Sequence, residues 1–221
     1  MQKQDNFVRL SGRIVNRYDR GKVTILTLSV AEMVRKEVKI NYPKVYFFHE
    51  DKTGAEEFLV KDEVSIIAHV ATPRKIRQSN GQEYISQALV GDSIEKRKGM
   101  YELLNIPDAG RGPLEPQMNS FIITGTLSSI RKTGDRSAQI VVDTMNDSHI
   151  NFVSINVATP EAFNMQIGNR VTVIGKVVTG FNEPKNDGEK RTYYQNLVGL
   201  SIRKTDTKDV KPVAKEEVTF N

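Results

Sequence analysis

The chain contains 221 residues, 38% of them hydrophobic and 27% charged, with a formal net charge of +5 and no cysteine. This length allows two domains of about a hundred residues each or one large β domain, and the hydrophobic content is sufficient for compact cores. The lack of cysteine excludes disulfides, thiolate nucleophiles and zinc–sulfur sites, while the basic excess favours a polyanionic partner such as a nucleic acid.

The N-terminal residues, MQKQDNFVRLSG, do not include the apolar stretch of a secretory signal. No run in the sequence approaches the roughly 18 consecutive apolar residues that a membrane-spanning helix needs. We therefore expect a cytoplasmic protein that does not act in a membrane.

Residues 1–98 have the pattern of five β-strands joined by turns. The expected strands are rich in Val, Ile, Thr, Phe and Tyr, and they fall near 7–16, 22–31, 38–49, 63–72 and 83–94. A short helix is expected between the third and fourth strands, where Thr53 and Glu56 have the spacing of a capping box. Three strands, a short helix and two further strands are the order of a five-stranded OB barrel.

Two segments lack this pattern. Residues 99–118 contain three prolines and three glycines, which favours an irregular linker. Residues 205–221, TDTKDVKPVAKEEVTFN, are polar and charged without periodicity, which favours a disordered tail. Between them, residues 119–204 form a second segment of domain size.

Residues 119–204 repeat the pattern of residues 1–98. The phrase VKDEVSIIAHVAT (60–72) matches IGNRVTVIGKVVT (167–179), and QALVGDSIEKRK (87–98) matches QNLVGLSIRK (195–204). Two further blocks match less closely: VYFFHEDKTGAEEF (45–58) lies beside INFVSINVATPEAF (150–163), and FVRLSGRI (7–14) lies beside FIITGTLS (121–128). Four blocks in the same order, at offsets of 105 to 114 residues, indicate two copies of one domain.

The sequence therefore predicts an all-β fold of two tandem five-stranded OB-fold barrels, each with a short helix between strands 3 and 4. The barrels are expected at 1–98 and 119–204, separated by the linker 99–118 and followed by the tail 205–221. In the second copy, Thr159 and Pro160 favour the start of the short helix and Gly168 its end.

The second copy resembles the single-stranded DNA-binding proteins of bacteria and phages. GNRVTVIGKVVT, a polar loop and GEKRTYYQNLVGLSI resemble the region in which their Gly-x-x-Val strand leads into a long basic hairpin, and INFVSINVATPEAFNMQIGNRV resembles their third strand and helix. The resemblance implies largely sequence-independent binding that sheathes single-stranded DNA in DNA replication, recombination or repair. Because family members commonly assemble four OB-folds, it also implies that two chains pair as a homodimer.

The chain departs from this family in two places. The family commonly uses tryptophan as a stacking residue, and this chain contains none. The family's tail ends in acidic residues and a terminal phenylalanine that docks partner proteins, whereas this chain ends KEEVTFN, with Phe220 followed by Asn221. The tail therefore resembles that of the family only in part, and this partial resemblance is the basis for expecting it to dock replication or repair proteins.

Non-specific binding to a single strand needs cations along the phosphates and flat side chains on which bases stack. In OB-folds these lie around strands 2 and 3 and in the loops that join strands 1–2 and 4–5. Basic residues recur in these loops of both copies, although hairpin tips are also charged simply because they are solvated. The predicted nucleic-acid-binding residues are Arg17, Tyr18, Arg20, Lys22, Tyr46, Phe48, Arg74, Lys75, Arg77, Tyr84, Arg131, Lys132, Arg136, Phe181, Lys190, Arg191, Tyr193 and Tyr194.

The alignment of the copies divides the aromatic residues of the third strand. Phe47 aligns with Phe152, so both are assigned to packing, whereas Tyr46 and Phe48 align with non-aromatic residues and are candidates for stacking. A packing role for Tyr46 and Phe48 stays open, because a barrel of this size also needs aromatic residues in its core.

No motif indicates an enzyme. The sequence lacks G-x-S-x-G, H-E-x-x-H and P-loop motifs, and its three histidines do not align with one another in the repeat. We therefore expect no catalysis, no metal and no cofactor. Two other functions stay open, because OB-folds serve several purposes: a tandem OB-fold adaptor that binds proteins, and an RNA- or tRNA-binding OB module.

Overall fold

The computed structural model describes residues 6–34, 37–77, 83–97, 118–146, 149–183 and 192–205. We call residues 6–97 the first half and residues 118–205 the second half. Their regular structure is β-strand with short 3-10 helices, and none of the helices in these ranges is long and apolar enough to cross a membrane.

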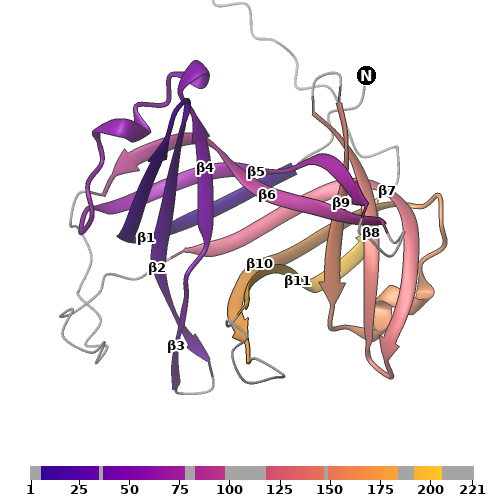
Figure 1. Cartoon of the computed structure of the whole chain (residues 1–221). Helices are drawn as coiled ribbons and strands as arrows, with labels where there is room; N and C mark the ends of the chain where they lie inside the picture. Colours follow the sequence, from indigo (N-terminus) through magenta and orange to yellow (C-terminus); the bar gives the residue numbers. More distant parts are fainter. Residues whose placement is uncertain are drawn as a thin grey trace, which may run out of the picture.

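Eleven strands make up the two halves (Figure 1). Those of the first half are β1 (Asn6–Arg20), β2 (Val23–Val34), β3 (Glu37–Asn41), β4 (Lys44–Phe48), β5 (Glu63–Arg77) and β6 (Glu83–Lys96). Those of the second half are β7 (Asn119–Gly134), β8 (Ser137–Asn146), β9 (His149–Val157), β10 (Arg170–Asn182) and β11 (Thr192–Lys204).

The strands of the second half close on themselves. β7 pairs with β8 and β10, β8 pairs with β9, and β11 pairs with β10 and in parallel with β9. This ring is a closed five-stranded barrel, consistent with an OB-fold. In the first half the same cycle of pairings links β1, β2, β4, β6 and β5, and β3 pairs with the end of β2.

The third strand of the first half is interrupted, although the sequence predicts one strand near 38–49. The break between β3 and β4 falls at Tyr42 and Pro43. Proline has no N–H to donate to a neighbouring strand, so a strand ends there readily. The carbonyl of Pro43 still accepts a hydrogen bond from the N–H of Leu28 at 3.0 Å. The corresponding β9 has no proline and is continuous.

The two halves join along β1 and β7, which pair antiparallel with Val8 opposite Phe121. Matched hydrogen bonds lie beyond this pair of strands. The N–H of Thr179 donates to Oδ1 of Asn41 at 3.0 Å, and the N–H of Thr72 donates to Oδ1 of Asn151 at 2.9 Å. Each half thus provides an acceptor for a main-chain N–H of the other. These bonds stabilise the junction, because a buried N–H without a partner is costly.

The alignment of the two third strands needs a correction. In β4, Tyr46 pairs with Val90, and in β9, Asn156 pairs with Val198. Val90 and Val198 hold the same place in the repeated QxLVGxSI phrase, so the third strands correspond at an offset of 110 residues. The offset of 105 residues read from the sequence is wrong there, since similar short apolar phrases match at more than one register.

This correction changes the role of one predicted core residue. Phe47 is fully buried, in agreement with the prediction, whereas Phe152 is only partly buried and corresponds to Tyr42. The N–H of Phe152 donates to Oγ1 of Thr72 at 2.9 Å, and the N–H of Tyr42 donates to Oγ1 of Thr179 at 2.7 Å. Phe152 therefore lies at the junction of the halves.

The segments predicted as short helices form 3-10 helices, η1 (His49–Asp51), η2 (Ala55–Glu57) and η3 (Pro160–Asn164). They are short enough for the tighter 3-10 geometry. The residue before η2 is Gly54, at φ 71°, and no side chain caps this helix, so the capping box expected from Thr53 does not form. Pro160 does begin η3, but Gly168 lies beyond the end of that helix.

Gly168 instead belongs to a turn that has a counterpart in the first half. Residues 59–62 and 166–169 each form a turn closed by a main-chain hydrogen bond, of 3.1 and 3.0 Å respectively. The third residue of each turn has a positive φ, which is 89° for Gly168 and 84° for Lys61. Glycine adopts this conformation without strain, whereas lysine does not.

Candidate nucleic-acid interface

The outer side of β1, β2 and β4 carries three of the predicted aromatic residues. Leu26 and Phe47 are fully buried inside, so their neighbours along each strand point outward. The register places Tyr18 opposite Ile25, and Ile25 opposite Tyr46. These three side chains therefore form one row across the three strands.

A second row lies beside the first, because Arg20 is opposite Val23 and Val23 is opposite Phe48. Exposure is 57% for Tyr18 and 38% for Phe48, which leaves both rings accessible to a ligand. The aromatic face, as we call it, consists of the outward side chains of both rows other than Arg20: Tyr18, Val23, Ile25, Tyr46 and Phe48.

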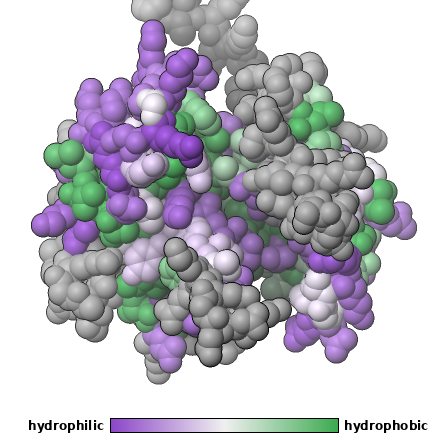
Figure 2. Space-filling view, in the orientation of Figure 1, coloured by the Kyte–Doolittle hydropathy of each residue, from purple (hydrophilic) through white to green (hydrophobic). Residues whose placement is uncertain are grey.

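Cations lie along the edges of the aromatic face. Arg20 and Lys22 are exposed at the turn between β1 and β2, where Gly21 takes a φ of 59°. Lys44 lies on β4 on the same side as Tyr46, since both alternate with buried residues. Figure 2 shows hydrophilic side chains gathered at the upper left, over the segment that follows β4. The sequence prediction did not include Lys44, which only the alternation along β4 could have indicated.

The second half adds two aromatic residues next to this face. The ring of Tyr193 lies under the ammonium of Lys44, with Nζ 4.3 Å from the ring centroid, and its hydroxyl donates to the carbonyl of Tyr42 at 2.5 Å. Burial, followed by the neighbouring hydroxyl of Tyr46, raises the pKa of Tyr193. Phe181 packs edge-on against Tyr193, with ring centroids 5.8 Å apart.

Glutamine side chains fasten each half to the other. The N–H of Lys44 donates to Oε1 of Gln195 at 2.7 Å, and Nε2 of Gln195 donates back to the carbonyl of Lys44 at 3.3 Å. Gln87 and Ser154 make the same two contacts in the other direction, at 3.0 and 3.1 Å. These bonds hold Tyr193 in place beside the first half. In the sequence, this pair of contacts is visible only as the glutamine repeated at the start of QALVG and QNLVG.

Tyr194 packs within its own half. It lies directly opposite Gly180 in the β10–β11 pair, and a Cβ at position 180 would overlap its ring and hydroxyl. The ring therefore covers the glycine and is partly buried.

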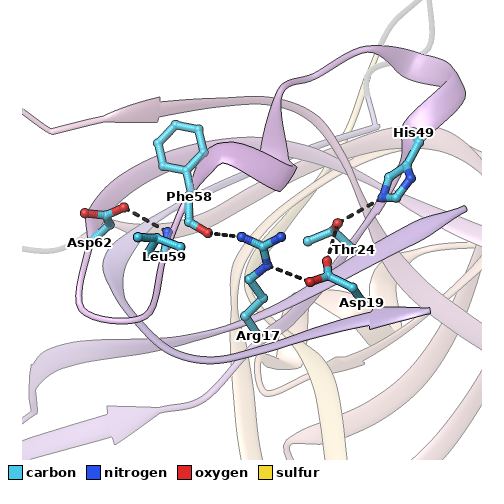
Figure 3. Close-up of polar contacts among 7 residues, drawn as sticks. All are labelled: Arg17, Asp19, Thr24, His49, Phe58, Leu59 and Asp62. Atoms are coloured by element: carbon cyan, nitrogen blue, oxygen red, sulfur yellow. Dashed lines mark hydrogen bonds and ion pairs between the residues drawn. The ribbon is translucent and has the colours of Figure 1, made fainter. Parts of the chain in front are cut away.

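The guanidinium of Arg17 is held by contacts inside the protein (Figure 3). Nε donates to Oδ2 of Asp19 at 2.9 Å, and Nη1 donates to the carbonyl of Phe58 at 2.7 Å. The hydroxyl of Thr24 donates to Asp19 at 2.7 Å and lies 3.0 Å from Nε2 of His49. Hydrogen bonds from Thr24 and then from Arg17 hold the pKa of Asp19 below its usual value. Arg17 thus links the end of β1, next to Tyr18, to the segment that contains Phe58.

The loop cations of the second half are exposed at the β7–β8 turn. Nη2 of Arg131 donates to Oε1 of Gln139 at 2.7 Å, while Nζ of Lys132 lies 3.9 Å from a carboxylate oxygen of Asp135. Arg136 is exposed at the tip of the turn. The β7–β8 turn of the second half corresponds to the β1–β2 turn of the first half, where Arg20 and Lys22 lie.

The remaining predicted residues are placed only in part. Main chain alone is described for Arg74, Lys75, Arg77 and Tyr84, which lie in β5 and β6. Lys190 and Arg191 lie outside the described residues. The register pairs Lys75 with Ile85, at the point of the first half where the second half pairs Phe181 with Tyr193. A role for these six residues stays a prediction.

The side chains of His49 and His69 are held by hydrogen bonds. His49 contacts Thr24, and Nδ1 of His69 lies 2.7 Å from Oδ1 of Asp92. In the part of the chain that the structure describes, no three His, Cys, Asp or Glu side chains come together as metal ligands would.

Two solved structures of a single-stranded DNA-binding protein from Thermus aquaticus are similar to this chain along almost its whole length. The wild-type protein has a TM-score of 0.60 at 15% sequence identity, over 95% of this chain and 97% of its own. A deletion mutant has a TM-score of 0.61 at 15% identity, over 96% of this chain and 100% of its own. No protein-family model and no curated protein matches the sequence. At this identity the likeness establishes a shared fold.

Proposed function

We propose that the protein binds single-stranded DNA with little sequence preference, through two OB-fold barrels in tandem. The barrels are residues 1–98 and 119–204, with 99–118 as linker and 205–221 as tail. The observation that carries the proposal is the aromatic face, where exposed rings lie beside exposed cations. Bases stack on such rings at about 1–3 kcal/mol each, and the cations contact the phosphates.

The expected biological role is to sheathe single strands exposed in the cytoplasm during DNA replication, recombination or repair. The fold shared with the Thermus aquaticus proteins supports this role, because those proteins are named for single-stranded DNA binding. The proposal includes no catalytic step. Docking of partner proteins through residues 205–221 concerns residues outside those described and stays a prediction.

Titration of labelled oligo-dT, oligo-rU and duplex DNA over a salt series tests the proposed function. We expect preference for oligo-dT, with log affinity falling against log salt by about 0.7 for each phosphate contact. An Arg20→Gln, Lys22→Gln double variant should lower this slope by about 1.4. Equal binding to duplex DNA, or no binding at low salt, would overturn the proposal. Preference for oligo-rU would indicate an RNA-binding module. No binding to any of the three nucleic acids would indicate an adaptor that binds proteins.

A homodimer belongs to the same proposal. The outer side of the sheet that joins the halves exposes Ile67, Ile122 and Ile174 by 37–39%, and Ile122 lies opposite Ile174. Ile122 also lies opposite Phe7, whereas Ile67 lies opposite the exposed Arg9. The apolar side chains around Ile122 support pairing with a second copy of the chain. Sedimentation equilibrium should give twice the chain mass for the native protein and the single-chain mass for Ile122→Lys. A native protein with the mass of one chain would contradict the pairing.

A further inference from the structure

The two halves present different outer surfaces on corresponding strands. In the first half the central row is Tyr18, Ile25 and Tyr46. In the second half, Arg131 pairs with Gln139, and Gln139 pairs with Asn156, so the same row is entirely polar. The neighbouring positions repeat this contrast, with Ser137 for Val23 and Ala158 for Phe48.

The polar side chains of the second half are bonded to one another. Arg131 donates to Gln139, and Nε2 of Gln139 donates to Oγ of Ser154 at 3.2 Å. Ser154 in turn exchanges hydrogen bonds with Gln87 of the first half. None of these side chains is an aromatic ring, and the guanidinium of Arg131, which could otherwise stack on a base, is engaged by its hydrogen bond to Gln139.

The aromatic face continues onto the second half. Lys44 bridges it to Tyr193, and Phe181, which is 57% exposed, packs against Tyr193. At the matching cross-strand pair of β5 and β6 the sequence has Lys75 and Ile85. The second half therefore adds aromatic residues to the face of the first half. The first half does not do the same for the second, because its corresponding pair, Lys75 and Ile85, contains no aromatic residue.

We propose that each chain stacks bases on one composite surface, made by the aromatic face of the first half together with Phe181 and Tyr193 of the second half. The corresponding outer surface of the second half does not stack bases. This inference rests on the proposed function, and it names the part of the molecule that performs it. The strand crosses from one half to the other on this surface, since aromatic residues of both halves line it.

Single tryptophan reporters test directly whether bases stack on the outer surface of the first half and not on that of the second. The chain has no tryptophan, so Tyr46→Trp and its structural counterpart Asn156→Trp each introduce one indole at matching positions. We expect saturating oligo-dT to quench the fluorescence of the Tyr46→Trp protein strongly and to leave that of the Asn156→Trp protein nearly unchanged. Equal quenching of both reporters would overturn the inference.

Affinities of alanine variants give a second test. Tyr46→Ala and Phe181→Ala should each weaken oligo-dT binding about tenfold without changing the salt slope, because they remove a stacking ring and no phosphate contact. Asn156→Ala is the matched control for Tyr46→Ala. Phe163→Ala removes an exposed ring of the second half, which lies in η3 with Nζ of Lys132 5.6 Å from its centroid. We expect both affinities to equal that of the native protein, and a loss in Phe163→Ala would show that the second half also stacks bases on its own outer surface. Unchanged affinity in Phe181→Ala would show that the second half does not contribute to the surface.

The two proposals fail in different ways. If the native chain does not bind oligo-dT at low salt, the proposed function is wrong. If the native chain binds but Asn156→Ala weakens binding as much as Tyr46→Ala, the function stands and the single composite surface is wrong. Circular dichroism melting of each variant, with Tyr46→Phe as the conservative substitution, separates a loss of stacking from a loss of folding.

Discussion

The two halves have the same cycle of strand pairings but different outer surfaces, aromatic in the first half and polar in the second. The inward positions are interchangeable in character: Leu26 and Ile140 are both fully buried, as are Val45 and Ile155. The outward positions are not, as Tyr46 and Asn156 illustrate. Barrel closure constrains the residues that pack inside, whereas the solvent-facing residues of the same strands are free to acquire or lose a binding role.

The hydrogen bonds that side-chain amides make between the halves are, in contrast, closely matched. Asn41 and Asn151 accept corresponding hydrogen bonds, and Gln87 and Gln195 do the same. Main-chain donors at a buried junction need partners in both directions, which explains why this part of the repeat is symmetric. The comparison therefore separates residues that hold the halves together from those that distinguish them. Four sets of substitutions test it, from the largest expected effect to the smallest.

Tyr193→Ala should have the largest effect, because it removes a partly buried ring and the hydrogen bond to Tyr42 together. We expect a loss of about 2–3 kcal/mol in the free energy of unfolding, with weaker oligo-dT binding. Tyr193→Phe keeps the ring and should cost only about 1 kcal/mol, with affinity retained. Urea denaturation and oligo-dT titration measure the two effects. If Tyr193→Ala left stability unchanged, Tyr193 would not be part of the junction.

Asn41→Ala and Asn151→Ala test the symmetry of the junction. Each substitution leaves a main-chain N–H at the junction without its acceptor, on Thr179 and on Thr72 respectively, so we expect each to lower the free energy of unfolding by about 2 kcal/mol. The exposed Asn156→Ala serves as control and should stay within about 0.5 kcal/mol of the native protein. Clearly unequal losses for the two junction residues, measured by urea denaturation, would contradict a symmetric junction.

Lys61→Gly and Gly168→Lys test the matched turns. Lys61 has a φ of 84° where the second half has glycine, so glycine at position 61 should raise stability by up to about 1 kcal/mol. Gly168→Lys should lower stability by about the same amount. The measurement is the urea midpoint at constant m-value. A lower midpoint for Lys61→Gly would show that the lysine side chain makes a contact worth more than the strain.

Asp19→Asn should have the smallest effect and the clearest pH dependence. The folded pKa of Asp19 is depressed, so its contribution to stability is present above the unfolded pKa of about 3.9 and is lost as pH falls through the folded pKa. Because Asp19 is exposed, solvent screening keeps this contribution small. Unfolding free energies of native protein and variant should differ at pH 7 and converge below about pH 3.

Lys132 occupies the position of Asp19 in the second half and provides the matched control. Lys132→Gln should not reproduce the Asp19→Asn difference, since lysine cannot accept the hydrogen bonds that Thr24 and Arg17 donate to Asp19. An Asp19→Asn difference that grew on acidification would contradict the role of the Thr24 and Arg17 hydrogen bonds.

Much of the fold could be predicted from local patterns. Alternation and β-branched composition located the strands of the first half, except for the break between β3 and β4. The inward direction of Val64, Ile66 and Val70 is visible in the sequence because side chains alternate with a period of two. The aromatic and basic character of the loops pointed to the region of the candidate interface. Phe47 could be assigned to the core, although the residue aligned with it could not.

Other features could not be predicted, because they depend on pairing between distant segments. The register of β9 against β11 decided that Asn156, rather than Asn151, corresponds to Tyr46. Arg17 has the appearance of a phosphate ligand in the sequence, yet it donates to a carbonyl 41 residues away. A local pattern does not contain contacts at such separations.

By itself, the sequence determined that this chain is all-β and that basic residues recur in corresponding loops of two segments with similar patterns. Both properties follow from side-chain alternation and composition, which act over a few residues. Only the tertiary structure placed Tyr193 of the second half beside Tyr46 and Lys44 of the first, and only the register identified Asn156 as the counterpart of Tyr46. These outcomes depend on barrel closure and on the β1–β7 junction, which bring together side chains from opposite ends of the chain.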